Sequence, residues 1–122
     1  ELTCGVIKEN GKATALPITE IITTNDFFDF EAKYKGESDE ITPAEISENL
    51  KEEIQRTAEK VYDLLNLSGI ARIDFIEMNG KPILIEVNTT PGMSDASIVP
   101  QMVAADNRKL SDIFTELLKE KL

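Results

Sequence analysis

The chain has 122 residues, which is enough for one domain with a single two-layered core. Its 23 acidic and 13 basic residues give a net charge of −10, and this balance excludes a role that depends on neutralising nucleic-acid phosphates. Histidine is absent and Cys4 is the single cysteine, so an internal disulfide and a zinc site of the usual kind are excluded too.

Two strand-like runs open the chain, at residues 2–8 and 13–22. Between them lies Asn10-Gly11-Lys12, and Asn-Gly is a strong hairpin signal, so we predict a β-hairpin. Cys4 falls in the first strand, where we expect a small buried residue with no reactive role. The polar, glycine-containing stretch 35–40 is expected to be a mobile loop.

The longest helix is predicted to begin at residues 42–45, whose sequence Thr-Pro-Ala-Glu has the form of a capping box with proline at the first helical position. Apolar residues then recur every three or four positions to about residue 66, and Ser68-Gly69 is expected to end the helix. The members of this stripe are Ile46, Leu50, Ile54, Ala58, Val61 and Leu65.

Two shorter helices are expected near the end of the chain, at about residues 98–106 and 111–121. The apolar spacing of the second helix predicts that Ile113, Phe114, Leu117 and Leu118 form its buried side. With two hairpins and three helices, the sequence predicts a single α+β domain with an antiparallel sheet.

The second predicted hairpin, of residues 70–78 and 82–87, carries the polar residues that matter most. A two-residue turn at Asn79-Gly80 would set Asp74 and Glu86 on different faces of the sheet. A three-residue loop with Gly80 in the left-handed region instead pairs Arg72 with Glu86 and makes Asp74 a diagonal neighbour of Glu86. The same register gathers the apolar residues on the other face, namely Ile73, Phe75, Ile83, Ile85 and Val87. We therefore predict the three-residue loop.

Asp74, Glu86 and Asn88 would then supply hard oxygen ligands on one face, of the kind that hold Mg²⁺ or Mn²⁺ against substrate phosphates. The alternative is an ordinary exposed ion pair between Arg72 and Glu86 with no ligand. Four polar residues at one end of a hairpin, followed by a Pro-Gly turn, favour the metal site.

The neighbouring candidates each have a structural and a functional interpretation. Gly92 is either a turn residue or the donor of a backbone N–H to a developing oxyanion. Ser97 is an N-cap, a carboxylate-binding hydroxyl, or both. Lys33 and Tyr34 are either surface residues or members of a loop that closes over a phosphate.

No apolar run is long enough to span a bilayer, and no signal-peptide pattern is present. We therefore expect no membrane partner and a cytoplasmic location. The chain opens at Glu1 in strand-like sequence without an initiator methionine, which favours a piece of a longer protein.

Four segments together resemble the C-terminal part of the D-alanine:D-alanine ligases of the ATP-grasp superfamily, in order and spacing over nearly the whole chain. They are Phe-Glu-Ala-Lys-Tyr ending at Tyr34, Ala-Arg-Ile-Asp ending at Asp74, Ile-Glu-Val-Asn-Thr-Thr-Pro-Gly-Met-Ser from Ile85, and Ser-Ile-Val-Pro from Ser97. The resemblance implies an ATP-grasp C-terminal domain, with an antiparallel sheet flanked by helices. The N-terminal and central domains would be absent.

The resemblance also implies roles at single positions. Asp74, Glu86 and Asn88 would bind two Mg²⁺ or Mn²⁺ ions, with Glu86 shared between them. Arg72 and the Gly92 N–H would stabilise the tetrahedral intermediate.

Other implied roles concern the substrates. Ser97 and Ile98 would hold the second D-alanine. Lys33 would contact the transferred phosphate, with Tyr34 and Glu1 in the same network. Phe27 would border the adenine. The position before the metal glutamate touches adenine in the family. Here it is Ile85, which the predicted register turns toward the core.

The implied activity is ATP-dependent formation of D-alanyl-D-alanine, ADP and phosphate, for peptidoglycan precursor synthesis and so for cell wall and cell shape. ATP phosphorylates one D-alanine carboxylate, and the amine of the second D-alanine attacks the acylphosphate. The missing domains would supply the first D-alanine site, the glycine-rich phosphate loop and the adenine hinge, so we expect these 122 residues to be inactive alone. A homodimer of the full-length protein is compatible with the sequence, which leaves the oligomeric state open.

Three alternatives stay open. Another ATP-grasp carboxylate-amine ligase would share the acidic strand pair but lack the Glu-Ala-Lys-Tyr and Ser-Ile-Val-Pro segments. A D-alanine:D-lactate-type ligase would keep the metal residues but replace Tyr34. A non-catalytic acidic interaction domain would need no aligned Asp74, Glu86 and Asn88.

Overall fold

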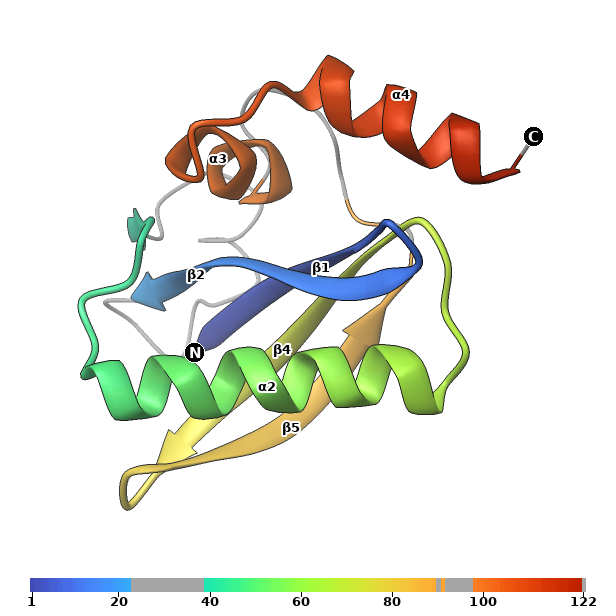
Figure 1. Ribbon diagram of the computed structural model, residues 1–122. Helices are drawn as coiled ribbons and strands as arrows, with labels where there is room; N and C mark the ends of the chain where they lie inside the picture. The colour runs from blue at the N-terminus through green and yellow to red at the C-terminus, as the bar shows by residue number, and fades with distance from the viewer. Residues whose placement is uncertain (23–38, 90, 92–97, 122) are drawn as a thin grey trace.

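The computed structural model describes residues 1–22, 39–89, 91 and 98–121. In that part of the chain five strands form one antiparallel sheet in the order β3-β2-β1-β4-β5. The strands are β1 (Leu2–Glu9), β2 (Lys12–Ile22), β3 (Asp39–Ile41), β4 (Ile70–Met78) and β5 (Lys81–Asn88). Helix α2 (Glu48–Leu64) packs on one face, and α3 (Ile98–Ala105) and α4 (Leu110–Lys121) lie toward the other (Figure 1). The predicted α+β domain is confirmed.

The first hairpin agrees with the sequence. Asn10 and Gly11 both have positive φ, at 52° and 78°, as the two central residues of a type I′ turn must. The stretch after this hairpin differs from the prediction, because Asp39 and Glu40 of the expected loop form β3 together with Ile41 and pair with the end of β2. Residues 35–38 lie outside the described part of the chain.

Helix α2 begins later than the capping-box pattern predicts. Ser47 is its N-cap, and the Ser47 hydroxyl accepts a 3.2 Å hydrogen bond from the backbone N–H of Leu50. The residues of the predicted box are engaged with β2 instead. The N–H of Ala44 donates to the carbonyl of Ile18 at 2.7 Å, and the hydroxyls of Thr42 and Thr19 are 2.5 Å apart. Pairing with the sheet therefore takes precedence over the local cap.

The buried stripe of α2 runs at intervals of four, through Leu50, Ile54, Ala58 and Tyr62. Val61 is only partly buried, and Leu65, the C-cap residue, is 55% exposed. Tyr62 was not in the predicted stripe, yet it is fully buried and donates its hydroxyl to the Gly69 carbonyl at 2.7 Å. Asn66, at φ 53°, ends the helix before the predicted Ser68-Gly69.

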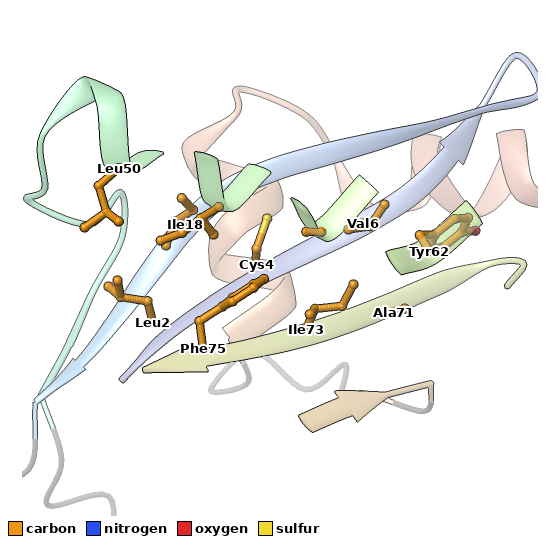
Figure 2. Packing of buried hydrophobic residues seen from close by; sticks show 11 residues of the cluster. Leu2, Cys4, Val6, Ile18, Leu50, Tyr62, Ala71, Ile73 and Phe75 are labelled. Atoms are coloured by element: carbon orange, nitrogen blue, oxygen red, sulfur yellow. The ribbon is translucent and has the colours of Figure 1, made fainter. Parts of the chain in front are cut away.

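The first core cluster lies between α2 and the sheet (Figure 2). It contains alternate residues of β1 and β4 and the stripe of α2, among them Leu2, Val6, Ile54, Ile73 and Phe75. Cys4 lies inside this cluster with no exposed surface, as predicted for a structural residue. Burial, together with the nearby charge of Glu59, raises the pKa of the Cys4 thiol far above its ordinary value.

The second core cluster covers the opposite face of the sheet. Ile7, Leu16 and Ile70 from the strands meet the buried side of α3, which is Ile98, Val99, Met102 and Val103. From α4, Ile113 is buried and Leu117 is partly buried, but Phe114 and Leu118 are 41% and 63% exposed. The predicted buried side of α4 is therefore only half correct, because in the described part of the chain α4 covers the sheet along a narrow strip.

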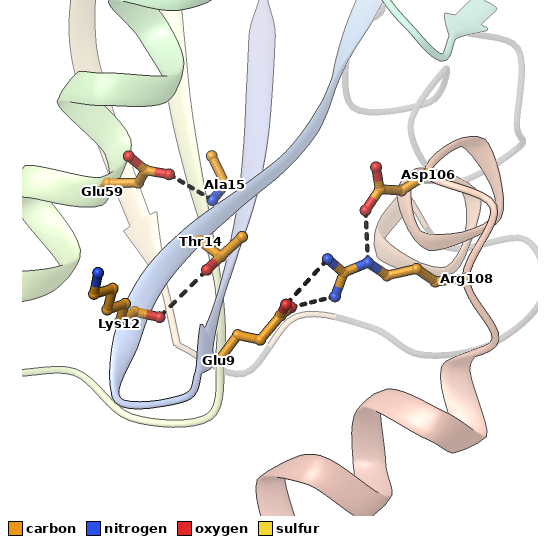
Figure 3. Close-up of polar contacts among 7 residues, drawn as sticks. All are labelled: Glu9, Lys12, Thr14, Ala15, Glu59, Asp106 and Arg108. Carbon is orange, nitrogen blue, oxygen red and sulfur yellow. Dashed lines mark hydrogen bonds and ion pairs between the residues drawn. The ribbon is translucent and has the colours of Figure 1, made fainter.

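Polar contacts tie the outer elements to the sheet (Figure 3). Arg108, in the connection between α3 and α4, forms ion pairs with Glu9 at the end of β1 and with Asp106 at 2.7 Å. The hydrogen bond to Glu9 raises the pKa of the Arg108 guanidinium above its ordinary value. On the other face, Glu59 of α2 accepts the backbone N–H of Ala15 at 2.9 Å. Among the described helices, none has the length and apolar character needed to cross a membrane.

Candidate functional site

The polar residues of the second hairpin lie on the face of the sheet that does not meet α2. Ala71, Ile73 and Phe75 of β4 pack in the cluster under α2, so the alternate residues Arg72 and Asp74 must point to the opposite face. Ile70 confirms this parity, since it packs with α3 in the second cluster.

The β4–β5 turn differs from the prediction. It is a two-residue turn, with Asn79 at φ 54° and Gly80 at φ 76°, and Met78 pairs with Lys81. The predicted three-residue loop is wrong. The register continues unchanged to Phe75 opposite Leu84, and there it shifts by one residue.

A β-bulge at Ile85 causes this shift. Beyond it Asp74 pairs with Glu86, Ile73 with Val87, and Arg72 with Asn88. The extra residue reverses the parity between the two halves of β5. The two-residue turn therefore still leaves Asp74 and Glu86 on one face, and they are directly opposed rather than diagonal.

The two-residue turn and the bulge also change the predicted apolar face. Ile73 and Phe75 are fully buried and Val87 is partly buried, as predicted. Ile83 and Ile85 are each 45% exposed, so placing them in the core is wrong for this chain. The parity that turned Ile85 toward the core no longer applies, which removes that argument against a contact between Ile85 and a ligand.

Asp74 is the buried centre of the site, with 2% of its surface exposed. Arg72 binds both of its carboxylate oxygens: Nε donates to Oδ1 and a terminal nitrogen donates to Oδ2, each at 3.1 Å. The Thr3 hydroxyl, on the neighbouring strand β1, donates to Oδ1 at 2.5 Å. The ion pair considered between Arg72 and Glu86 is replaced by this pair between Arg72 and Asp74.

Glu86 and Asn88 complete the face across the strand pair. Directly opposed residues in an antiparallel ladder have Cβ atoms about 4.5–5.5 Å apart, which lets two carboxylates share a cation. Glu86 is exposed and Asn88 is partly buried, so both side chains lie where a ligand can reach them. The described residues contain no cluster of three or more histidine, cysteine, aspartate or glutamate side chains. A metal ion here would take its remaining ligands from phosphate oxygens and water, which suits Mg²⁺ or Mn²⁺.

The other predicted site residues fall into two groups. Glu1 precedes β1, and its backbone exchanges hydrogen bonds with Ile21. Ile98 is the first residue of α3 and is buried against the same face of the sheet. Five predicted site residues lie outside the described part of the chain: Phe27, Lys33, Tyr34, Gly92 and Ser97.

Thr3 is the residue that sequence analysis missed. A threonine in an apolar strand is ordinary in a sheet, and only the pairing of Thr3 with Asp74 across β1 and β4 reveals the contact.

A cavity of about 480 Å³ lies elsewhere, between the β1–β2 turn and α4, and its lining includes Lys8, Arg108 and Asp112 but none of the predicted site residues.

Comparison with known proteins gives a family match over nearly the whole chain. The family model described as "D-ala D-ala ligase C-terminus" matches residues 1–119. A D-alanine–D-alanine ligase from Parabacteroides distasonis is 46% identical over 123 residues, which cover 100% of this chain and 37% of that relative. The chain thus spans little more than a third of the length of this relative.

Solved structures share the fold. A D-alanine–D-alanine ligase from Bacillus anthracis, complexed with ATP, aligns with a TM-score of 0.76 and 28% identity, covering 97% of this chain and 36% of that one. The VanG D-Ala:D-Ser ligase from Enterococcus faecalis aligns with a TM-score of 0.78 and 27% identity, covering 97% of this chain and 35% of that one.

Proposed function

This chain belongs to the family of D-alanine–D-alanine ligase C-terminal domains, and we propose that it carries the metal-binding part of the active site of such a ligase. The full-length protein would join two D-alanines with conversion of ATP to ADP and phosphate. The observation that carries this proposal is the face shared by Arg72, Asp74, Glu86 and Asn88, where the two carboxylates are directly opposed.

In this proposal Asp74, Glu86 and Asn88 hold two Mg²⁺ or Mn²⁺ ions, with Glu86 shared between them. The residues fit such ions, because all three offer hard oxygen atoms and lie on one face of adjacent strands. The bound ions would supply charge neutralisation for the phosphates of ATP.

Arg72 has two tasks in this scheme. It neutralises Asp74 through two hydrogen bonds, so the buried carboxylate is not left as an uncompensated charge. During the reaction its guanidinium, with the Gly92 N–H, would stabilise negative charge on the tetrahedral intermediate. The Arg72 side chain is 23% exposed, so its guanidinium can contact both Asp74 and a bound intermediate.

The substrate contacts are assigned to further residues. Ser97 would hold the second D-alanine together with Ile98, the first residue of α3. Lys33, Tyr34 and Glu1 would surround the transferred phosphate. Phe27 would border the adenine, and we add Ile85 to that border because the bulge leaves it 45% exposed.

The rest of the full-length protein would complete the site. The chain covers 37% of the Parabacteroides distasonis relative and 36% of the ATP-bound Bacillus anthracis structure. We infer that a central domain supplies the glycine-rich phosphate loop and the adenine hinge, and that an N-terminal domain supplies the first D-alanine site. The reaction would take place in the cytoplasm and serve peptidoglycan synthesis.

Tyr34 favours the amide product. The attacking amine must reach the acylphosphate and lose a proton, and a neutral phenol adds no positive charge near the incoming ammonium. A histidine at this position could be cationic and would favour a hydroxy acid instead. We expect the full-length protein, given D-alanine with excess D-lactate near neutral pH, to form mainly D-alanyl-D-alanine. Predominant D-alanyl-D-lactate would overturn the dipeptide assignment and leave the ATP-grasp assignment intact.

The central experiment is ADP release by the full-length protein with ATP, MgCl₂ and D-alanine. Asp74→Asn and Glu86→Gln should each abolish D-alanine-dependent ADP release. Glu77→Gln is the matched control, because Glu77 is an exposed acid on β4 with the opposite parity to Asp74. Wild-type protein without magnesium-dependent nucleotide binding would instead favour the non-catalytic interaction domain, and equal activity of all variants would refute the metal assignment.

A further inference from the structure

A buried threonine touches the central carboxylate of the site. Thr3 has no exposed surface and Asp74 has 2%, and the Thr3 hydroxyl donates to Oδ1 of Asp74 at 2.5 Å. The two residues are direct cross-strand partners in the β1–β4 ladder. A hydrogen bond to a buried, charged acceptor is among the stronger kinds in proteins.

Thr3 and Arg72, the two side chains that bind Asp74, differ in conformational freedom. Thr3 is on β1, which lies between β2 and β4, and a β-branched side chain has few rotamers. Arg72 is a long side chain with 23% of its surface exposed. Thr3 binds Oδ1 alone, whereas Arg72 donates to Oδ2 as well as to Oδ1. Thr3 is therefore the fixed partner and Arg72 the exchangeable one.

We propose that Thr3 is a positioning residue for metal binding. Its hydroxyl holds the Asp74 carboxylate in one orientation through Oδ1 and leaves Oδ2 as the oxygen that exchanges between the Arg72 guanidinium and a divalent cation. This inference rests on the proposed metal role of Asp74. It adds that the carboxylate of Asp74 is preorganised from the central strand of the sheet, so the cation need not order it.

The sheet supplies a matched control at Thr19. Thr19 is the direct partner of Thr3 in the β1–β2 ladder and is equally buried. Its hydroxyl contacts that of Thr42 at 2.5 Å, whereas the hydroxyl of Thr3 contacts Asp74. Thr3→Val and Thr19→Val thus each remove one buried hydroxyl with little change in volume, but only the first removes a bond to Asp74.

The test measures Mn²⁺ binding to the full-length protein in the presence of ADP, from the electron paramagnetic resonance signal of free Mn²⁺. Thr3→Val should weaken Mn²⁺ binding by about 10–100-fold, the usual effect of removing a group that is hydrogen-bonded to a metal ligand. Thr3→Ser keeps the hydroxyl and should restore binding to near the wild-type value. Thr19→Val should bind Mn²⁺ as wild type does.

Thermal unfolding in parallel separates this role from general stability. Thr3→Val and Thr19→Val should lower the melting temperature by similar amounts but differ in Mn²⁺ affinity. If Thr3→Val does not fold, Thr3→Ala takes its place in the test. Unchanged Mn²⁺ affinity without the Thr3 hydroxyl, or equal loss in Thr19→Val, would overturn the inference while the metal assignment stands. Wild-type protein that binds ADP but no Mn²⁺ would overturn both.

Discussion

Gly5 sets how closely α3 approaches the sheet. It lies in β1 opposite Arg72, and a Cβ at this position would come within 3.0 Å of the Met102 sulfur and 3.1 Å of a Leu16 methyl. Met102 and Leu16 are both fully buried, so neither has free space into which to withdraw. The missing side chain thus fixes the position of the helix whose first residue, Ile98, belongs to the proposed substrate site.

Gly5→Ala should therefore destabilise the domain. Overpacking a well-packed core costs about 1–3 kcal/mol, and the reduced backbone freedom of alanine offsets about 0.5–1 kcal/mol. The expected net loss is about 0.5–2 kcal/mol. With a specific unfolding entropy of about 2.1 cal/mol/K per residue, this lowers the melting temperature of the chain by about 2–8 °C.

Thermal unfolding of the 122-residue chain measures this loss. A double-mutant cycle with Met102→Ala tests its cause, because shortening Met102 removes the closest contact and should make Gly5→Ala less damaging in that background. In the full-length protein the same substitution should raise KM for the second D-alanine more than it lowers kcat. A Gly5→Ala chain as stable as wild type, with no coupling to Met102, would refute this account of α3 packing.

Four further results are expected. Asn79→Ala should lower the free energy of unfolding, measured with denaturant, by about 1 kcal/mol because Asn79 has φ 54°. In a three-residue loop the same substitution would be nearly neutral. Cys4 should resist thiol reagents in the folded chain and react on unfolding. Since burial raises its pKa, stability should fall as pH rises above the unfolded thiol's pKa of about 8.5, and Cys4→Ala should lack that fall. The isolated chain should release no ADP from ATP, with or without D-alanine, and measurable ligase activity would contradict the proposed division of labour.

The sequence predicted the elements that local rules determine. Asn10-Gly11 makes its turn by the conformational preference of two residues, and Leu50, Ile54 and Ala58 form a stripe by helical period alone. The common face of Asp74 and Glu86 was also predicted, although by a wrong turn length.

Features that depend on contacts distant in sequence were not predictable. The bulge at Ile85 changes the β5 register with neither glycine nor proline at that position to indicate it, so the exposure of Ile85 was missed. The exposure of Ile83 was missed because the predicted turn was one residue too long. The start of α2 depends on how Ala44 pairs with β2. Thr3 acquires a role only when the sheet places it against Asp74.

If Asp74, Glu86 and Asn88 bind the divalent cations of an ATP-dependent ligase, a bound manganese ion must lie beside them. Anomalous diffraction from crystals of the full-length protein grown with MnCl₂ and ADP would locate such an ion. We expect manganese peaks about 2 Å from oxygens of Asp74 and Glu86, with nucleotide phosphate oxygens completing the coordination. Bound nucleotide with manganese absent from these side chains, or present only at other residues, would contradict it.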